Sequence, residues 1–282
     1  MRLGYSIPRD WSYSISGGAW ASGDAGNPAY LCDRAPQERT YFTWPAGAQT
    51  TSTTCSITAT RVASFVPGLA CLLNTSLPLG TLVKLYGRRV GDAGYTYALG
   101  GNTQTARVVA LPDGGRGIIW VPATGLDAIY AFQVQAFNDV FGAAVITAEA
   151  LHSIGEVNVM PASVIDHETG PTERWSELRA TWTLGSQAHL SGRTPQRSVT
   201  VRSCPMTYAE ARDEGLANDM DWQTLAGLIA RDPAVLAVLY DSSSDLAQRS
   251  AVFGVATGVG MTGLPGRYQQ TETLTITEAP SG

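Results

Sequence analysis

Short alternating segments separated by turn residues dominate the first half of this sequence, and they constrain its fold more than any other feature. In these segments apolar and polar residues alternate with a period of two, as in a strand with one buried face. They are Thr54–Val66, Leu82–Arg89, Thr105–Leu111, Gly117–Val121, Ile129–Phe137 and Ala144–Val159. Turn sequences such as LPDGGRG and VPATGLD separate them, and no helical stripe of useful length intervenes. This pattern predicts a β-sandwich.

The composition agrees with a β-rich protein that has a weakly charged surface. Charged residues make up 15% of the 282 residues, and 30 glycines and 15 prolines supply turns. The length fits two domains or one large all-β unit, and we favour two. The formal charge of −5 gives no overall electrostatic reason to bind nucleic acid or an acidic bilayer. The local pair Arg88 and Arg89 is interpreted as a solvated strand end.

Changes in the local pattern divide the chain into three parts. Residues 1–28 are rich in Gly, Ser and Tyr without a sustained period, so we predict an N-terminal arm or irregular first strands. Residues 29–162 carry the alternating segments of the sandwich. A polar connection, SVIDHETGPTER, then leads into residues 163–282, where strands and helices follow in the order ββααβββ. We therefore expect a second, smaller, β-rich α+β domain.

One packed helix is predicted clearly in the second domain, near residues 219–231. Asp219 or Asp221 can cap its first turn. Its apolar residues fall on one face, and they are Trp222, Leu225, Leu228 and Ile229. We expect this face to pack on the sheet, with Trp222 as a buried anchor.

The sequence contains no signal for a membrane span, for secretion or for a metal site. No stretch approaches the roughly 18 apolar residues of a membrane helix, and the N-terminal MRLGYSIPRDW lacks the apolar run of a signal peptide. We therefore expect the chain to begin its life in a cytoplasm. Its four cysteines, Cys32, Cys55, Cys71 and Cys204, form no CxxC pair, so reduced thiols are expected. No cofactor and no metal are predicted.

Two motifs look like catalytic or cofactor sites, but both have simpler explanations. Residues 258–263, GVGMTG, match GxGxxG, yet a strand-like segment rather than a helix follows, so a hairpin loop is expected. Asp166, His167 and Glu168, with Glu173 beyond them, gather carboxylates and an imidazole. Adjacent residues of an extended chain point in opposite directions, so a solvated linker is the simpler explanation. No catalytic residues are predicted.

His152 lies in the segment ALHSIGEVNV, which has the alternation of a half-buried strand. His152, Glu156 and Asn158 share one parity, which we assign to the solvent-facing side of the strand. No nucleophile motif such as GxSxG accompanies any histidine of the chain. A purely structural strand is therefore predicted.

Seven tryptophans favour a sugar-binding hypothesis, because aromatic faces stack on sugar rings. Trp11 and Trp20 lie in the N-terminal arm and are our candidates for exposed anchors of a protein–protein interface. The alternative is that the arm completes the sandwich of its own chain. The other tryptophans lie within or beside strand or helix patterns, and core packing is expected for most of Trp44, Trp120, Trp175, Trp182 and Trp222.

The order and texture of the segments resemble those of tail proteins from long-tailed bacteriophages. YLCDRAPQERTYFTW, the sandwich strands and ALHSIGEVNVMPA resemble the galactose-binding-like jelly rolls found in these proteins. RWSELRATWTLGSQ, MDWQTLAGLIA, FGVATGVG and ETLTITEAP resemble a companion tail-tip or baseplate domain. The resemblance covers nearly the whole chain.

This resemblance implies a minor tail protein, which is a virion structural protein of the tail tip or baseplate. Such a protein is assembled in the host cytoplasm and resides in the virion tail. Its partners would be copies of itself, in a three- or six-fold ring between tail tube and receptor-binding apparatus, and other tail proteins. No enzymatic activity is implied. Low charge, open β-edges and an arm suit a subunit that its neighbours complete.

Two other functions stay open from the sequence. A carbohydrate- or host-receptor-binding module fits the sandwich pattern and the supply of Trp and Tyr, with a host-surface glycan as its partner. A hydrolase would need Asp166, Glu168 and Glu173, which form the only carboxylate cluster that the sequence offers for it.

Overall fold

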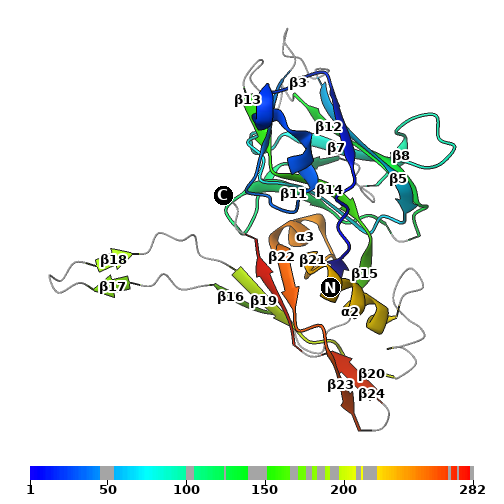
Figure 1. The fold of residues 1–282 in the computed structure, drawn as a ribbon, viewed down its shortest axis with the longest axis vertical. Coiled ribbons are helices and arrows are strands. Elements are labelled where there is room, and N and C mark those ends of the chain that lie inside the picture. Colours follow the sequence, from blue (N-terminus) through cyan, green and yellow to red (C-terminus); the bar gives the residue numbers. More distant parts are fainter. Residues whose placement is uncertain are drawn as a thin grey trace.

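Strands predominate in the computed structural model of the chain, and the fold is mainly β (Figure 1). The described residues are 1–44, 54–99, 105–123, 125–138, 151–165, 171–175, 180–182, 188–190, 197–207, 211, 221–265, 268–271 and 273–279. They form a β-sandwich followed by a smaller β-rich unit with packed helices, so the predicted mainly β fold class is confirmed.

The sandwich pairs a six-stranded sheet with a four-stranded sheet in the described part of the chain. The six-stranded sheet has the order β2 (Ser12–Ser16), β5 (Thr54–Phe65), β12 (Ile129–Phe137), β7 (Leu82–Arg88) and β8 (Tyr97–Ala98), and β9 (Thr105–Arg107) also pairs with β7. The four-stranded sheet has the order β10 (Val109–Ala110), β11 (Arg116–Trp120), β6 (Leu69–Leu73) and β14 (Glu156–Met160). A small sheet of β13 (Leu151–Ile154), β4 (Thr40–Thr43) and β3 (Ala19–Trp20) lies beside them.

The four-stranded sheet is buried on both faces, which explains the continuous apolar run LACLL in β6. Ala70 and Leu72 belong to the core between the two sheets of the sandwich. Leu69, Cys71 and Leu73 belong to a second core, which also contains residues from beyond residue 230. A continuous apolar run of this length is the expected sequence of a strand covered on both sides.

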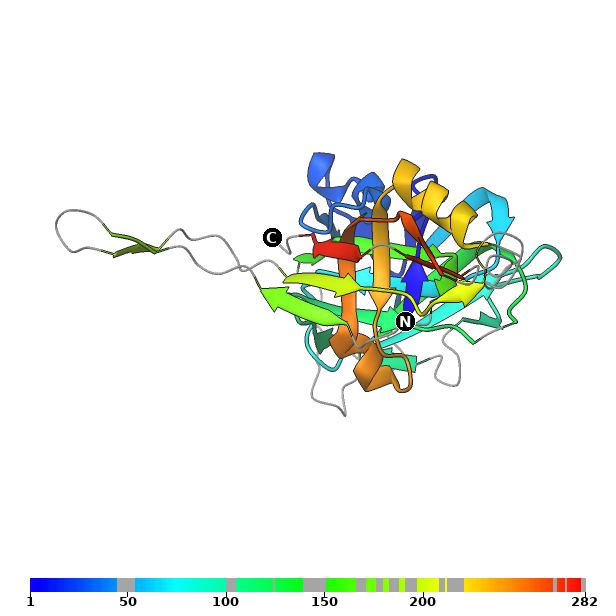
Figure 2. The ribbon, with the colours of Figure 1, turned by 90° about the horizontal axis from the view of Figure 1, so that it is seen from below.

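The second unit supplies the layer that covers this sheet. Its strands form a seven-stranded sheet, in the order β15 (Ala162–Val164), β1 (Arg2–Gly4), β21 (Ala234–Val238), β22 (Ala251–Thr257), β25 (Leu274–Glu278), β19 (Arg197–Val201) and β16 (Thr172–Trp175). Helix α2 (Trp222–Arg231) covers the other face of this sheet, and helix α3 (Ser244–Ser250) contacts β11 and β21. Figure 1 shows the sandwich above the strands of the second unit, and Figure 2 looks onto the second unit from below.

Helix α2 matches the predicted helix, with Asp221 as its cap. The Asp221 carboxylate accepts a hydrogen bond of 2.6 Å from the Thr224 backbone N–H. Trp222 is 1% exposed and packs with Leu225 and Ile229 in the core of the second unit, so its predicted role as a buried anchor is confirmed. Helix α3 is not predicted from the sequence, because the expected order ββααβββ places no helix after the strand β21.

The N-terminal residues do not form a separate arm, which corrects one alternative for residues 1–28. β1 pairs with β15 and β21 of the second unit, while β2 pairs with β5 of the sandwich. The segment therefore completes two sheets of its own chain. Because β1 belongs to the second unit and β15 spans residue 162, that unit contains residues 2–4 as well as residues from 162 onward.

Two hairpins extend from the second unit. β20 (Met206–Thr207), β24 (Tyr268–Thr271) and β23 (Met261–Leu264) form one small sheet, and a turn with Gly258 at φ +75° leads into it. The GxGxxG motif, predicted as a hairpin loop, is a turn only in its first half, because β23 begins at Met261 inside it. The strand β24 then follows, so a strand and not a helix comes after the motif, as predicted. β17 (Ala180–Trp182) and β18 (Ala188–Leu190) form the other, which we name the projecting hairpin. It lies well away from the rest of the molecule in both views (Figures 1 and 2).

Candidate functional site

The solvent-facing side of the six-stranded sheet carries an extensive set of hydrogen-bonding side chains. Alternate residues of each strand point into the sandwich core, for example Val83 and Leu85 of β7. The residues between them point outward and are half-buried or exposed, apart from the buried Ser56. We name this surface the polar face, and its members are Ser12, Ser14, Ser16, Ser56, Thr58, Thr60, Lys84, Tyr86, Arg88, Thr105, Arg107, Tyr130, Gln133, Gln135 and Phe137.

Strand register arranges these side chains in rows across the sheet. One row runs through residues in cross-strand register, Ser14, Thr58, Gln133 and Tyr86. The next row runs through Ser16, Ser56, Gln135, Lys84 and Thr105. Neighbouring strands lie about 4.8 Å apart, so each row repeats hydrogen-bonding groups at that spacing. Such rows can follow an extended polymer of polar units.

The two glutamines link these rows by hydrogen bonds. Gln133 Nε2 donates to Thr58 Oγ1 at 3.3 Å, and Gln135 Nε2 donates to Gln133 Oε1 at 2.9 Å. Each bond fixes the orientation of one amide on an open sheet surface. The face is therefore partly preorganised for a ligand.

The polar face is basic although the chain as a whole is acidic. The formal charge of the chain is −5, yet strands β2, β5, β7, β8, β9 and β12 contain no Asp or Glu. Lys84, Arg88 and Arg107 all lie on the outward side of neighbouring strands β7 and β9. This segregation of charge favours an anionic ligand over a cationic one.

Arg88, at the end of β7, is held between two tyrosines. Its guanidinium carbon lies 5.8 Å from the ring centroid of Tyr95 and 5.7 Å from that of Tyr130. Its Nε donates to the Asp92 backbone carbonyl at 3.1 Å. Among the described residues Arg88 makes no ion pair with a carboxylate. We name Arg88, Tyr95 and Tyr130 the arginine clamp.

The neighbouring Arg89 is neutralised, in contrast to Arg88. It bonds to the Asp92 carboxylate at 3.1 Å and to Asp127 at 2.8 Å, and its guanidinium lies 4.4 Å from the ring centroid of Tyr97. Hydrogen bonds from Arg89 hold the pKa of Asp92 below its ordinary value. Of the two arginines predicted as a solvated strand end, Arg89 therefore has a structural role, and Arg88 is available for a ligand.

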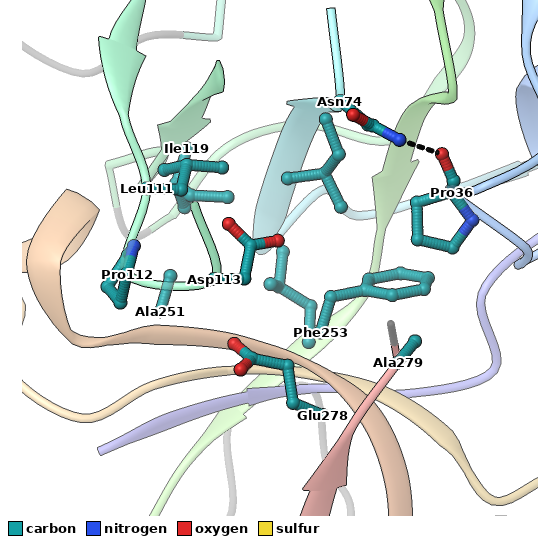
Figure 3. Close-up of a pocket in the computed structure, with 12 residues that line it drawn as sticks. Pro36, Asn74, Leu111, Pro112, Asp113, Ile119, Ala251, Phe253, Glu278 and Ala279 are labelled. Carbon is teal, nitrogen blue, oxygen red and sulfur yellow. Dashed lines mark hydrogen bonds between the residues drawn. The ribbon is translucent and has the colours of Figure 1, made fainter. Parts of the chain in front are cut away.

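Figure 3 shows a small pocket between the two units, with two carboxylates facing each other. Asp113 comes from the turn between β10 and β11, and Glu278 comes from β25. Burial, together with the nearby Asp113 carboxylate, raises the pKa of Glu278 to about 7. The cavity measures about 20 Å³, which accommodates about one water molecule. This carboxylate pair therefore cannot hold a substrate.

A larger cleft of about 320 Å³ opens elsewhere on the boundary between the two units. Arg2 pairs with Asp241 at 2.6 Å inside it, and Arg2 Nη1 also donates to the Pro122 carbonyl at 2.9 Å. Its charged groups thus compensate each other. Its lining also contains Ser242, Ser243 and Ser244 next to Asp241. The Asp241 carboxylate is paired with Arg2, and Ser243 Oγ caps helix α3 by accepting a hydrogen bond from the Leu246 backbone N–H at 3.2 Å, so these groups have structural partners.

Glu156 and Asn158 are buried, so the prediction that they lie on the solvent-facing side of their strand is wrong. Both are at most 1% exposed. Glu156 accepts hydrogen bonds from the Arg34 backbone N–H at 3.1 Å and from Asn158 Nδ2 at 3.0 Å, and burial raises its pKa to about 8. The prediction failed because a second layer of chain covers this side of the strand. Neither residue lines a described cavity, so this cluster is structural.

Trp11 is buried, so the prediction that it is an exposed interface anchor is wrong. It is 6% exposed, packs edge-on against Phe132 at a centroid distance of 4.8 Å, and donates from Nε1 to Asn158 Oδ1 at 2.8 Å. The sandwich of its own chain covers it. Trp20 is half-buried, 6.4 Å from the Phe42 ring, and its role in an interface stays a prediction.

Most other candidates of the sequence analysis have structural surroundings or lie outside the described residues. His152 is 7% exposed and lies beside the rings of Phe42 and Trp44. Glu173 pairs with the buried Arg197 at 3.0 Å. Asp166, His167 and Glu168 lie outside the described residues. Within the described part of the chain, no group of three potential metal ligands occurs and no helix is long and apolar enough to cross a membrane.

Most tryptophans outside residues 1–28 whose side chains the structure describes are buried, as predicted, and the side chain of Trp182 lies outside that part. Trp44, Trp120 and Trp222 are at most 3% exposed. Trp175 differs, because it is 47% exposed on the edge strand β16. This edge strand leads toward the projecting hairpin, so an exposed aromatic side chain marks the base of that feature.

Comparisons with known proteins found similarity of structure only. No family model and no curated protein matches the sequence. The chain is similar to a CBM32 module from a family 31 glycoside hydrolase of Clostridium perfringens, with TM-score 0.37 and 10% identity over 55% of this chain and 96% of that one. It is similar to the C-terminal domain of a Bacteroides fragilis chitobiase, with TM-score 0.35 and 13% identity over 56% and 96%. A xylan-binding module from Roseburia intestinalis has TM-score 0.28 and 16% identity over 54% and 96%.

Proposed function

We propose that the chain is a non-enzymatic structural subunit of the tail tip or baseplate of a long-tailed bacteriophage, where copies assemble into a ring. The observation that carries this proposal is the projecting hairpin. β17 and β18 pair only with each other in the described part of the chain and lie far from both units (Figures 1 and 2).

A two-stranded hairpin of this kind needs a partner surface. An isolated hairpin is marginally stable in water, and its two edges expose unpaired backbone N–H and C=O groups. Each strand of the hairpin has three residues, and neither has a second neighbour among the described strands. A neighbouring subunit that pairs with an edge or packs on a face supplies what the hairpin lacks.

The base of the hairpin has the character of an interface as well. All four residues of β16 are exposed, and Trp175 presents half of its surface there. The buried Arg197 on β19 fixes this strand, because it pairs with Glu173 and lies 6.0 Å from the Trp175 ring centroid. A rigid strand with an exposed aromatic residue suits an anchor for a partner protein.

The test is to remove the hairpin without disturbing the sheet. Trp175 and Arg197 are opposite each other in the β16–β19 pair, so an Asn-Gly turn can replace residues 176–196. We expect native mass spectrometry to show three or six copies for the full chain and a monomer for the variant, with unchanged thermal unfolding. A monomeric full chain, or a variant that assembles like the full chain, would contradict the proposal.

A second candidate function is carbohydrate binding by the sandwich, and the polar face favours it. Rows of Gln, Ser and Thr side chains beside Tyr86 and Tyr130 offer hydrogen bonds and aromatic surface on one exposed sheet. Binding of the full chain on a glycan array tests it. Gln133→Ala should weaken a positive signal, since this residue lies in the centre of a row, whereas an array without any signal would contradict it.

A further inference from the structure

We infer that the polar face binds an anionic polysaccharide, with Arg88 as the residue that pairs with a carboxylate of the sugar. This inference rests on the second candidate function, carbohydrate binding, and names its ligand class. The observations that carry it are the missing acids on the face, the rows of neutral donors and acceptors, and the arginine clamp.

The clamp fixes the guanidinium of Arg88 before any ligand arrives. The rings of Tyr95 and Tyr130 lie 5.8 and 5.7 Å from its guanidinium carbon, and the Asp92 carbonyl accepts its Nε–H at 3.1 Å. Cation–π contacts of this kind restrict the side chain without neutralising it. An arginine already ordered loses less entropy on binding, so it is a better receptor than a free surface arginine.

The geometry of the donor suits a carboxylate group. A guanidinium presents parallel N–H groups in one plane, which match the two oxygens of a carboxylate. The carboxylate of Asp92, whose backbone carbonyl accepts from Arg88, already bonds to Arg89 Nε and Nη2 at 3.1 and 3.2 Å. An external carboxylate therefore meets little competition from within the protein.

The surroundings of Arg88 explain why the ligand is a polysaccharide rather than a small anion. On β7 the outward residues are Leu82, Lys84, Tyr86 and Arg88, so two cations flank one aromatic ring at the Arg88 end of the strand. Gln135 is in register with Lys84, and Gln133 is in register with Tyr86. A chain of sugar units lying across these rows can place carboxylates near the cations while its hydroxyl groups bond to the amides.

The proposal differs from general attraction of negative charge. Arg249 supplies a control of equal net charge, because its side chain is 74% exposed on helix α3, where it pairs with Asp245 at 3.0 Å, and its replacement by glutamine removes the same charge outside the polar face. Non-specific attraction treats the two arginines alike, since it depends on net charge and screening. Recognition by the clamp instead predicts that binding depends on Arg88 and not on Arg249.

The experiment measures binding of the full chain to polygalacturonate and to its fully methyl-esterified form by isothermal titration calorimetry. Both polymers have the same backbone, but only the first carries free carboxylates. We expect at least about tenfold tighter binding to the free acid, a loss of about tenfold in Arg88→Gln, and no change in Arg249→Gln. Arg88→Lys should lose most of the preference, because it keeps the charge without the planar fork. Thermal unfolding of each variant shows that the fold is intact.

The possible failures are distinguishable. Equal binding of the free acid and the ester overturns the anionic ligand while carbohydrate binding stands. Equal losses in Arg88→Gln and Arg249→Gln, or equal binding of dextran sulfate, show attraction of charge only and overturn the role of the clamp. Absence of binding to either polymer, together with an empty glycan array, refutes the second candidate function itself.

Discussion

Glu156→Gln gives the sharpest test of the packing between the sandwich and the rest of the chain. The carboxyl group is fully enclosed, with the Arg34 backbone N–H and Asn158 Nδ2 as its hydrogen-bond donors. Burial raises its pKa from 4.5 to about 8 in the folded protein. The folded state therefore keeps a proton that the unfolded state releases.

The sign and size of the effect follow from this shift. Because the folded-state pKa is the higher one, the stability that depends on this proton is complete below pH 4.5 and is lost as the pH rises toward 8. At about 1.4 kcal/mol per pKa unit the whole loss is about 5 kcal/mol, and about 4 kcal/mol of it falls between pH 5 and pH 9. A glutamine at this position does not titrate and lacks that loss.

The assay is urea unfolding followed by tryptophan fluorescence at several pH values from 5 to 9. We expect the free energy of unfolding of the native chain to fall by about 4 kcal/mol more than that of Glu156→Gln over this range. The glutamine side chain accepts one hydrogen bond fewer than the glutamate side chain at every pH. The comparison therefore uses the change of the unfolding free energy with pH and not its absolute value. Parallel curves for the two proteins would refute the burial and protonation of Glu156. Glu278→Gln is the control, since its removal flattens the curve only between about pH 4.5 and pH 7, below the folded-state pKa of Glu156.

Three further predictions concern the folded core. Trp222→Ala should cost about 3–5 kcal/mol in unfolding free energy, and Trp222→Phe clearly less, because the indole nitrogen has no hydrogen-bond partner among the described residues; equal stability would show that α2 is not packed. Deletion of residues 2–24 should abolish the cooperative thermal transition, since β1 and β2 belong to two different sheets, and a folded product would contradict that topology. Gly155→Ala should lower the stability by about 1–3 kcal/mol in urea unfolding, because its Cβ would lie 2.0 Å from the Pro36 carbonyl oxygen.

The strands of the sandwich could be predicted because their periodicity is local. Ile129–Phe137 is one strand in the structure as in the prediction, and Leu82–Arg89 differs by one residue from β7. Helix α2 was predictable for the same reason, since its apolar face and its capping Asp221 lie within eleven residues of sequence. Where the periodicity and the capping residues of a strand or helix lie within its own segment, the sequence alone predicts it.

Burial that depends on distant parts of the chain could not be predicted. The polar residues of β14 have the pattern of a solvent-facing side, but in the structure the N-terminal segment and the second unit cover them. Trp11 looks exposed because its partners, Phe132 and Asn158, lie more than a hundred residues away. The polar side chains were identified correctly, but their surroundings come from tertiary packing.

The candidate site was missed for a related reason. Arg88 was recognised only as one of two adjacent cations, because Tyr95 follows an intervening turn and Tyr130 lies on another strand. Alternation places Lys84, Tyr86 and Arg88 on one side of β7, but the register with β12 and β5 is a property of the fold. The absence of Asp and Glu from these strands was the signal that the sequence offered. It indicates a basic surface only when the strands are known to be neighbours in one sheet.

Electron cryomicroscopy of the assembled full-length chain tests the central proposal most directly. The account predicts a closed ring in which β17 and β18 of each subunit pack on or pair with the neighbouring subunit or an adjoining tail protein, while the polar face stays accessible on the outside. A reconstruction that shows single chains with the projecting hairpin surrounded by solvent, or a ring whose contacts exclude the hairpin, would contradict it.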